Sequence, residues 1–225
     1  MNGEELSGIV ATVRKLFHSD LPALLSLCLG NPQYYAFLGE EPTMDALAAE
    51  MAELPSGCSP DQKSYLGFFD AGGDLIAVLD LVRGYPAERC AFIGFFMVDA
   101  SRQGTGVGSL LITRLLDRLH GEGVSRVRLA YVEGNEQSRH FWRKCGFVEA
   151  GAPIDQGEYR VVPMGVRWHR PFLFRRHASD NDKLKNQHNV APLAEKSLPP
   201  AERQPASRTF LRGVSSPVAA SIKSA

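Results

Sequence analysis

Apolar and polar residues along the first 170 positions follow two periods, one typical of helices and one typical of strands. Helical spacing of apolar residues, with capping residues before and Gly or Pro after, predicts four helices. They cover residues 21–30, 44–54, 108–120 and 136–145. Asp20 and Thr43 are the expected N-caps of the first two helices, and Gly121 is the expected stop of the third.

Short apolar runs between turn sequences predict the strands. They cover residues 8–17, 63–69, 75–82, 90–98, 125–132, 146–151 and 158–168. The turn sequences 70–74 and 83–89 join three of these strands as hairpins. Residues 90–98 (CAFIGFFMV) are apolar on both faces, which is typical of a strand in the middle of a sheet. The order of the elements predicts an α/β fold.

The composition changes near residue 170. Residues 171–225 are rich in Pro, Ser, Asn, Gln and charge, and such a segment buries too little apolar surface to offset its ordering entropy. They contain nine Lys and Arg against four Asp and Glu, so this part carries +5 and residues 1–170 carry −5. We therefore predict a folded domain over residues 9–170 and a basic, disordered C-terminal tail over 171–225. Within the tail, residues 208–214 (RTFLRGV) form either a short docking motif or a chance apolar cluster.

Charge, hydropathy and cysteine usage exclude several classes of protein. A mildly negative body is not the footprint of a nucleic-acid-binding protein, and no segment approaches the ~20 apolar residues of a membrane span. The four cysteines lie far apart, with no CxxC and no His at metal-ligand spacing, so we expect reduced thiols and no metal. These features favour a cytoplasmic protein with no nucleic-acid or membrane partner. They do not decide between a monomer and a homodimer.

Residues 101–111 (SRQGTGVGSLL) place three glycines between an apolar strand and the start of a helix. Backbone N–H groups and the helix dipole converge on an anion at such a position. A P-loop is excluded because no Lys-Ser/Thr follows the glycines, and the dinucleotide fingerprint G-x-G-x-x-G fails at Ser109. From these residues alone, the segment is either a phosphate-binding loop or a tight strand-to-helix turn.

Residues 98–119 and 123–151 together resemble the GCN5-related N-acetyltransferase (GNAT) family. The family's Q/R-x-x-G-x-G/A loop corresponds here to Gln103, Gly104, Thr105, Gly106, Val107 and Gly108. Its N-x-x-A-x-x-F-Y-x-x-x-G-F segment corresponds to Asn135, Ser138, Phe141, Trp142, Gly146 and Phe147. The resemblance covers residues 9–170, and residues 31–43 are similar to a subgroup of bacterial acetyltransferases. It implies a single domain with a mixed, mostly antiparallel twisted sheet, helices on both faces, and splayed fourth and fifth strands.

The resemblance also implies acetyl-CoA as cosubstrate. The loop amides would bind its diphosphate, and the amides of Met97 and Val98 would bind the pantetheine arm in the gap between the splayed strands. Asn135 would bind pantetheine, cap the helix that follows, or both. Arg102 and Arg139 are either phosphate contacts or ordinary surface arginines. The implied cosubstrate-binding residues are Met97, Val98, Gln103, Gly104, Thr105, Gly106, Val107, Gly108, Asn135, Phe141 and Trp142.

The catalytic groups depart from the family pattern. Trp142 stands where the family often has a tyrosine that protonates the departing thiolate, and an indole N–H cannot act as an acid at neutral pH. We expect Trp142 to form a wall of the thioester pocket instead. Asp80, in the apolar run AVLDLV, is either the general base or the end of its strand. The alternative carboxylates are those of Glu40 and Glu41, which we expect beside Tyr34 and Tyr35 in a helical region on the substrate side.

Together these residues predict transfer of an acetyl group from acetyl-CoA to a primary amine of a small molecule or peptide. We expect direct attack by the amine in a ternary complex. A non-catalytic acyl-CoA-binding module and a nucleotide-binding domain are the alternatives from other classes.

Overall fold

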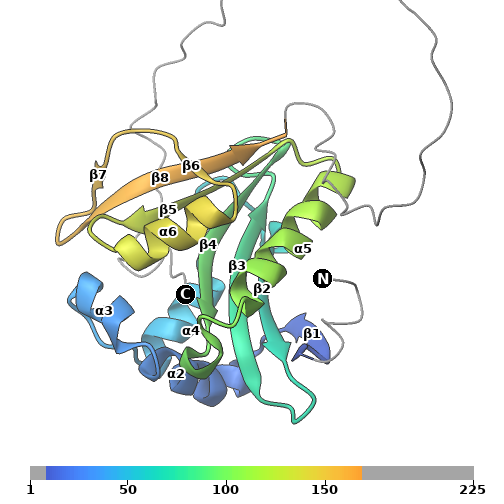
Figure 1. Cartoon of the computed structure of the whole chain (residues 1–225), viewed down its shortest axis with the longest axis vertical. Helices are drawn as coiled ribbons and strands as arrows, with labels where there is room; N and C mark the ends of the chain where they lie inside the picture. Colours follow the sequence, from blue (N-terminus) through green and yellow to red (C-terminus); the bar gives the residue numbers. More distant parts are fainter. Residues whose placement is uncertain (1–8, 169–225) are drawn as a thin grey trace, which may run out of the picture.

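The computed structural model describes residues 9–168, which form one mixed sheet (Figure 1). The strand order is β1-β2-β3-β4-β5-β8-β6, and β7 pairs with β8. Neighbouring strands are antiparallel except for β4 and β5, which are parallel. The strands are β1 (Thr12–Lys15), β2 (Lys63–Phe69), β3 (Leu75–Arg83), β4 (Cys90–Val98), β5 (Arg126–Val132), β6 (Val148–Glu149), β7 (Ile154–Asp155) and β8 (Arg160–Arg167).

Helices cover both faces of the sheet, so the predicted fold class is confirmed. In Figure 1, α5 and α6 cross in front of the sheet, α2 and α4 lie behind it, and α3 lies at its side. The helices are α2 (Leu21–Leu29), α3 (Pro32–Leu38), α4 (Met44–Ala52), α5 (Val107–Gly121) and α6 (Glu136–Lys144). The expected tail over 171–225 lies outside the described residues. Within them, no helix is both long and apolar enough to cross a membrane.

Three local expectations need correction. The Asp20 carboxylate accepts hydrogen bonds from Arg14 and from the Phe17 amide, and does not cap α2. Gly121 is the last residue of α5, and Gly123, with φ of 85°, supplies the left-handed turn after it. The short helix α3 lies where a helical region was expected around residues 34–41, but its bounds and its start at Pro32 were not predicted. Thr43 does cap α4, because its hydroxyl accepts from the Ala46 amide at 3.2 Å.

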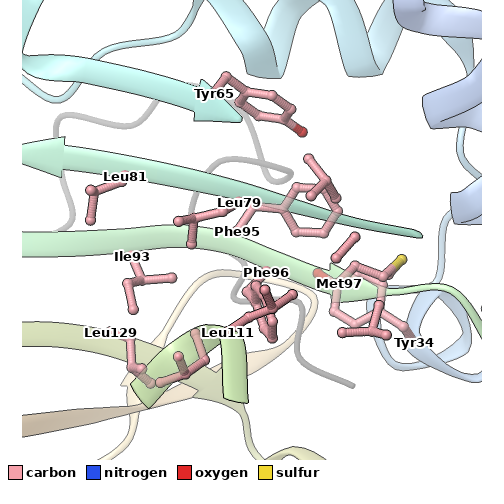
Figure 2. Close-up of a cluster of buried hydrophobic side chains, with 14 of the residues drawn as sticks. Tyr34, Tyr65, Leu79, Leu81, Ile93, Phe95, Phe96, Met97, Leu111 and Leu129 are labelled. Atoms are coloured by element: carbon pink, nitrogen blue, oxygen red, sulfur yellow. The ribbon is translucent and has the colours of Figure 1, made fainter. Parts of the chain in front are cut away.

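Strand β4 is buried at every position, as predicted for the centre of the sheet. Figure 2 shows Ile93, Phe95, Phe96 and Met97 projecting from it into the apolar layers on its two sides. The core is continuous across both layers, and it holds β4 rigidly against its neighbours.

A bulge interrupts β4 at the point where it leaves β5. Asp80 pairs with Phe95 but the next residue of β3 pairs with Ile93, so Gly94 is the extra residue. Strands β4 and β5 pair only over Cys90–Phe92 and Arg126–Arg128. Beyond these residues the two strands are not paired, which confirms the splay that the family resemblance implies.

Candidate active site

The three loop glycines meet two different structural requirements. Gly104 and Gly106 have φ of 74° and 92°, a conformation that side chains with a Cβ rarely adopt. Gly108 lies in the first turn of α5, where a Cβ would lie 3.1 Å from the Phe141 ring and 3.3 Å from a Val98 methyl group. The loop therefore turns sharply and its helix packs closely on β4, so that the first amides of α5 face a small cavity of about 110 Å³.

This loop cavity is lined by Gln103, Gly104, Gly106, Gly108, Phe141 and Lys144, among others. Lys144 was missed by sequence reasoning, since a lysine at the end of a polar helix reads as a solvated charge. It has no ion-pair partner between residues 9 and 168. Arg102 also lines this cavity, and it pairs with Asp70. Arg139 does not line it and pairs with Glu136 and Glu149.

The register of β3 and β4 decides which β4 amides face the gap. The Asp99 amide donates to the Ile76 carbonyl on the β3 side. Because hydrogen-bonding direction alternates along an antiparallel strand, Met97 turns its amide toward β3, whereas Phe96 and Val98 turn theirs toward the gap. The Val98 carbonyl accepts from the side-chain amides of Gln103 and Asn31, which agrees with that direction. The Met97 amide therefore does not face the gap as expected, and the amides that face it are those of Phe96 and Val98.

A cavity of about 250 Å³ lies at the mouth of the gap. Its lining includes Asn31, Tyr34, Met97, Gln103 and Asn135, and Figure 2 shows the Tyr34 ring beside Met97. Gln103 donates to Asn31 at 2.5 Å, which joins the glycine loop to the segment before α3. The Asn135 side-chain oxygen caps α6 by accepting from the Ser138 amide at 2.9 Å. Of the two expected roles of Asn135, capping is therefore confirmed, and its place in this cavity leaves the pantetheine role as a prediction.

A third cavity, of about 430 Å³, lies on the other side of α3 and has an acidic rim. Glu40, Glu41 and Tyr35 line it, together with Cys28. Burial raises the pKa of Tyr35 far above its ordinary value, so its hydroxyl stays neutral. The expected substrate-side residues therefore line two different cavities. Tyr35, Glu40 and Glu41 line this acidic cavity, whereas Tyr34 lines the cavity at the mouth of the gap (the mouth cavity). The Tyr34 and Tyr35 rings pack edge to face, with 5.0 Å between their centroids.

Asp80 lies inside β3, three residues before its end, and not at a strand terminus. Its carboxylate is buried 3.3 Å from the Lys63 ammonium. A Cβ on Gly94 would lie 2.6 Å from that carboxylate, so the missing side chain leaves room for Asp80 beside the bulge. Asp80 therefore faces the point where β4 and β5 begin to separate.

Asp80 belongs to a buried polar cluster that sequence reasoning missed. Lys63 also donates to the backbone carbonyls of Glu50 and Glu53, at 2.7 and 2.6 Å. The Tyr65 hydroxyl donates to the buried Glu50 carboxylate at 3.3 Å. Burial, and then the nearby charges of Glu50 and Asp80, raise the pKa of Tyr65 well above its ordinary value. The cluster thus concentrates charge behind the bulge on the face covered by α4.

Trp142 is completely buried on the opposite face. Its ring lies 6.0 Å from Phe96, 5.0 Å from Phe141 and 5.2 Å from Phe147, measured between ring centroids. These rings form a compact aromatic cluster, and the expected role of Trp142 as a wall of the thioester pocket stays a prediction. The indole nitrogen Nε1 has no hydrogen-bond partner in the described part of the chain.

Comparison with known proteins explains this combination of glycine loop, bulge and separated parallel strands. A sequence model of the Acetyltransferase (GNAT) family matches residues 31–147. The chain belongs to the GNAT family. It is accordingly an acyltransferase, and the resemblance seen in its sequence is confirmed.

Solved structures support the fold of this GNAT member. A putative phosphinothricin N-acetyltransferase matches with a TM-score of 0.54 and 21% identity over 69% of this chain and 97% of its own. An acetyltransferase from Thermus thermophilus matches with a TM-score of 0.55 and 21% identity, over 71% and 99%. The spermidine N-acetyltransferase from Vibrio cholerae, in complex with CoA and spermine, matches with a TM-score of 0.53 and 23% identity, over 69% of this chain and 94% of its own. A search of curated proteins found no match.

No group of three or more His, Cys, Asp or Glu side chains that could hold a metal ion is found in residues 9–168. The four cysteines lie within the same residues, and none of them is paired in a disulfide there.

Proposed function

We propose that this protein transfers the acetyl group of acetyl-CoA to a primary amine of a small molecule or peptide by direct attack. The observation that carries the proposal is the three-glycine loop at the start of α5, which opens onto the gap between β4 and β5. When bound, acetyl-CoA supplies the activated acyl group as a thioester. A cytoplasmic location stays a prediction, and both a monomer and a homodimer are compatible with the proposal.

The residues present fit this cosubstrate. Gln103–Gly108 present backbone amides and the positive end of the α5 dipole to a diphosphate, and Lys144 adds a positive charge at the same cavity. Farther along the gap, the amides of Phe96 and Val98 have no strand partner, because β5 has moved away. They would bind acceptor oxygens of the pantetheine arm, and would stabilise the oxyanion that develops at the carbonyl during attack.

The acidic cavity supports an amine acceptor. Glu40 and Glu41 attract an ammonium group, and Tyr35 adds an aromatic face. We propose Asp80 as the base that takes the proton from the attacking amine, directly or through water, because its carboxylate lies at the bulge. The thiol that leaves takes its proton from water, since Trp142 cannot supply one.

The test combines calorimetry with acetyl-CoA and thiol release with a panel of primary amines. Binding together with turnover on at least one amine supports the proposal. Binding without turnover on any amine favours a non-catalytic acyl-CoA-binding module. Absence of acetyl-CoA binding by the full chain, or preference for NAD or ATP over CoA, would overturn the assignment of the loop.

A further inference from the structure

A cavity of about 700 Å³ lies away from the gap, at the end of the sheet where β5 begins and β8 ends. It is larger than each of the three cavities of the candidate active site. Neither the glycine loop nor the segment over residues 30–43 lines it. Its volume is typical of small-molecule binding sites, and the proposed transfer reaction does not account for it.

The register of β5 and β8 brings three arginines together at this cavity. Arg126 lies directly opposite Arg167, and Arg128 follows two residues along β5, so their side chains leave the sheet on the same face. Gly165 lies opposite Arg128 and carries no side chain, which leaves space beside the arginines. All four residues line the cavity.

The arginines give the cavity an excess of positive charge. Like charges directly opposite each other destabilise an antiparallel sheet, and no carboxylate in the described part of the chain forms an ion pair with Arg126 or Arg167. Among the described lining residues, Asp117 supplies the one carboxylate, whereas Lys144 adds a further cation. A bound anion would relieve this repulsion, and guanidinium groups pair well with carboxylate and phosphate oxygens.

The wall of the cavity also offers apolar surface. Leu116 of α5 and Trp168, directly after β8, line it together with Val148 of β6. Val148 is 66% exposed, more than any other large apolar side chain in residues 9–168. Exposed apolar surface next to a group of cations indicates a ligand that has an apolar body as well as an anionic group.

The arginines lie far from the glycine loop. Helix α5 starts directly after the loop, and the ring of His120 at its other end lies 5.1 Å from that of Trp168. Figure 1 shows this end of α5 at the same end of the sheet as the start of β5. The helix spans about 20 Å from Val107 to His120. A cosubstrate whose diphosphate lies at the loop would not reach the arginines with its nucleoside end, although Lys144 borders both cavities.

We propose that Arg126, Arg128 and Arg167 form a second binding site, for a small molecule that carries a carboxylate or phosphate group on an apolar body. The oxyanion pairs with the guanidinium groups of Arg126 and Arg167, and the apolar body packs on Val148 and Trp168. The site does not depend on the proposed function, because binding there requires no acetyl transfer.

Calorimetry on the full chain tests the site with four probes: 1-naphthyl phosphate, 2-naphthoate, the uncharged 2-naphthamide, and inorganic phosphate. We expect the two naphthyl anions to bind at least about 10-fold more tightly than the other two probes, with an affinity that falls as salt is added. Equal affinity for 2-naphthamide would refute an anion site. Equal affinity for inorganic phosphate would refute the apolar contact.

Glutamine variants show whether the arginines bind the probes. Arg126→Gln and Arg167→Gln should each lower the affinity for 1-naphthyl phosphate by about 10-fold or more. Thermal stability without ligand should be held or raised, because a pair of opposed like charges is removed. Arg114→Gln, at an exposed position of α5 outside the cavity, is the matched control and should change neither. Unchanged affinity in both arginine variants, or a ligand-free protein destabilised by both, would overturn the proposal.

Competition separates this site from that of the cosubstrate. We expect 1-naphthyl phosphate to bind with the same affinity when 3′-phospho-ADP, the nucleotide part of CoA, is saturating. Displacement by 3′-phospho-ADP, with acetyl-CoA affinity lowered in Arg126→Gln, would make the cavity part of the cosubstrate site and refute a second ligand. Failure of acetyl-CoA to bind would overturn the proposed function, whereas 1-naphthyl phosphate binding in the same protein would still support the second site.

Discussion

Asp80→Asn tests a structural and a catalytic role of the same carboxylate at once. The substitution keeps the shape of the side chain but leaves the buried Lys63 ammonium without the carboxylate that lies 3.3 Å from it. Removing one partner of a buried ion pair costs about 3–5 kcal/mol. For a domain of this size that corresponds to a decrease in Tm of roughly 6–20 °C. If Asp80 is also the base, kcat should fall by about 10²–10⁴-fold in the folded variant.

The two effects are separated by adding Lys63→Met. Unfolding in urea is measured for Asp80→Asn, for Lys63→Met and for the double variant, and thiol release is measured at a temperature at which each is folded. We expect the double variant to be more stable than Asp80→Asn alone, because no unpaired charge remains buried. A loss of stability below about 1 kcal/mol for Asp80→Asn would refute the buried ion pair. A fall in turnover of less than about threefold would refute Asp80 as base and leave Glu40, Glu41 or a water chain.

Three further predictions concern the loop and its surroundings. Gly106→Ala and Gly106→Asp share the backbone strain of a left-handed residue, about 1–2 kcal/mol, but calorimetry should show acetyl-CoA affinity lost by at least about 100-fold only with Asp, whose charge opposes the diphosphate; equal losses would contradict a phosphate site. Lys144→Gln should weaken CoA binding by up to about fivefold and reduce its salt dependence, whereas Arg143→Gln, outside the loop cavity, should change neither. Burial raises the pKa of the Cys145 thiol from its ordinary value of 9.0 to about 11. The folded protein therefore keeps this proton more tightly than the unfolded chain, and urea unfolding should show the free energy of unfolding falling as the pH rises from 9.0 toward 11. Cys145→Ala should remove that part of the pH dependence.

The sheet was predicted well because its strands are marked locally. β2 and β4 have the predicted bounds, since each is an apolar run that ends at residues typical of turns. The bounds of α3, in a region expected only loosely to be helical, were missed for an equally local reason. It has seven residues, begins at a proline and ends at a glycine with φ of 71°, so its length and ends are those of a loop. Its order comes from the burial of Tyr34, Tyr35 and Leu38 against the core, which no window of sequence contains.

The part of the candidate site that was predicted from the sequence is the part whose residues follow one another in the chain. The glycine loop depends on a strand, a turn and a helix start that follow one another, and all three were found. The cluster of Asp80, Lys63 and Glu50 depends on two strands and a helix that meet only in the folded protein. In the sequence Lys63 reads as a solvated charge at a strand start. The direction of the Met97 amide depends on register with β3, which the pattern of side chains does not specify.

Helix α3 lies between the mouth cavity and the acidic cavity. Under the proposed function, the cosubstrate side of the site is built from β4, β5 and the two helices packed on them, whereas the acceptor side depends on one short segment over residues 30–43. Three inward side chains of that segment hold it to the core, and the outward ones, including Phe37, Glu40 and Glu41, do not. The proposed function therefore predicts that mutation or library design at the outward positions changes amine specificity, at little risk to folding or to the transfer chemistry.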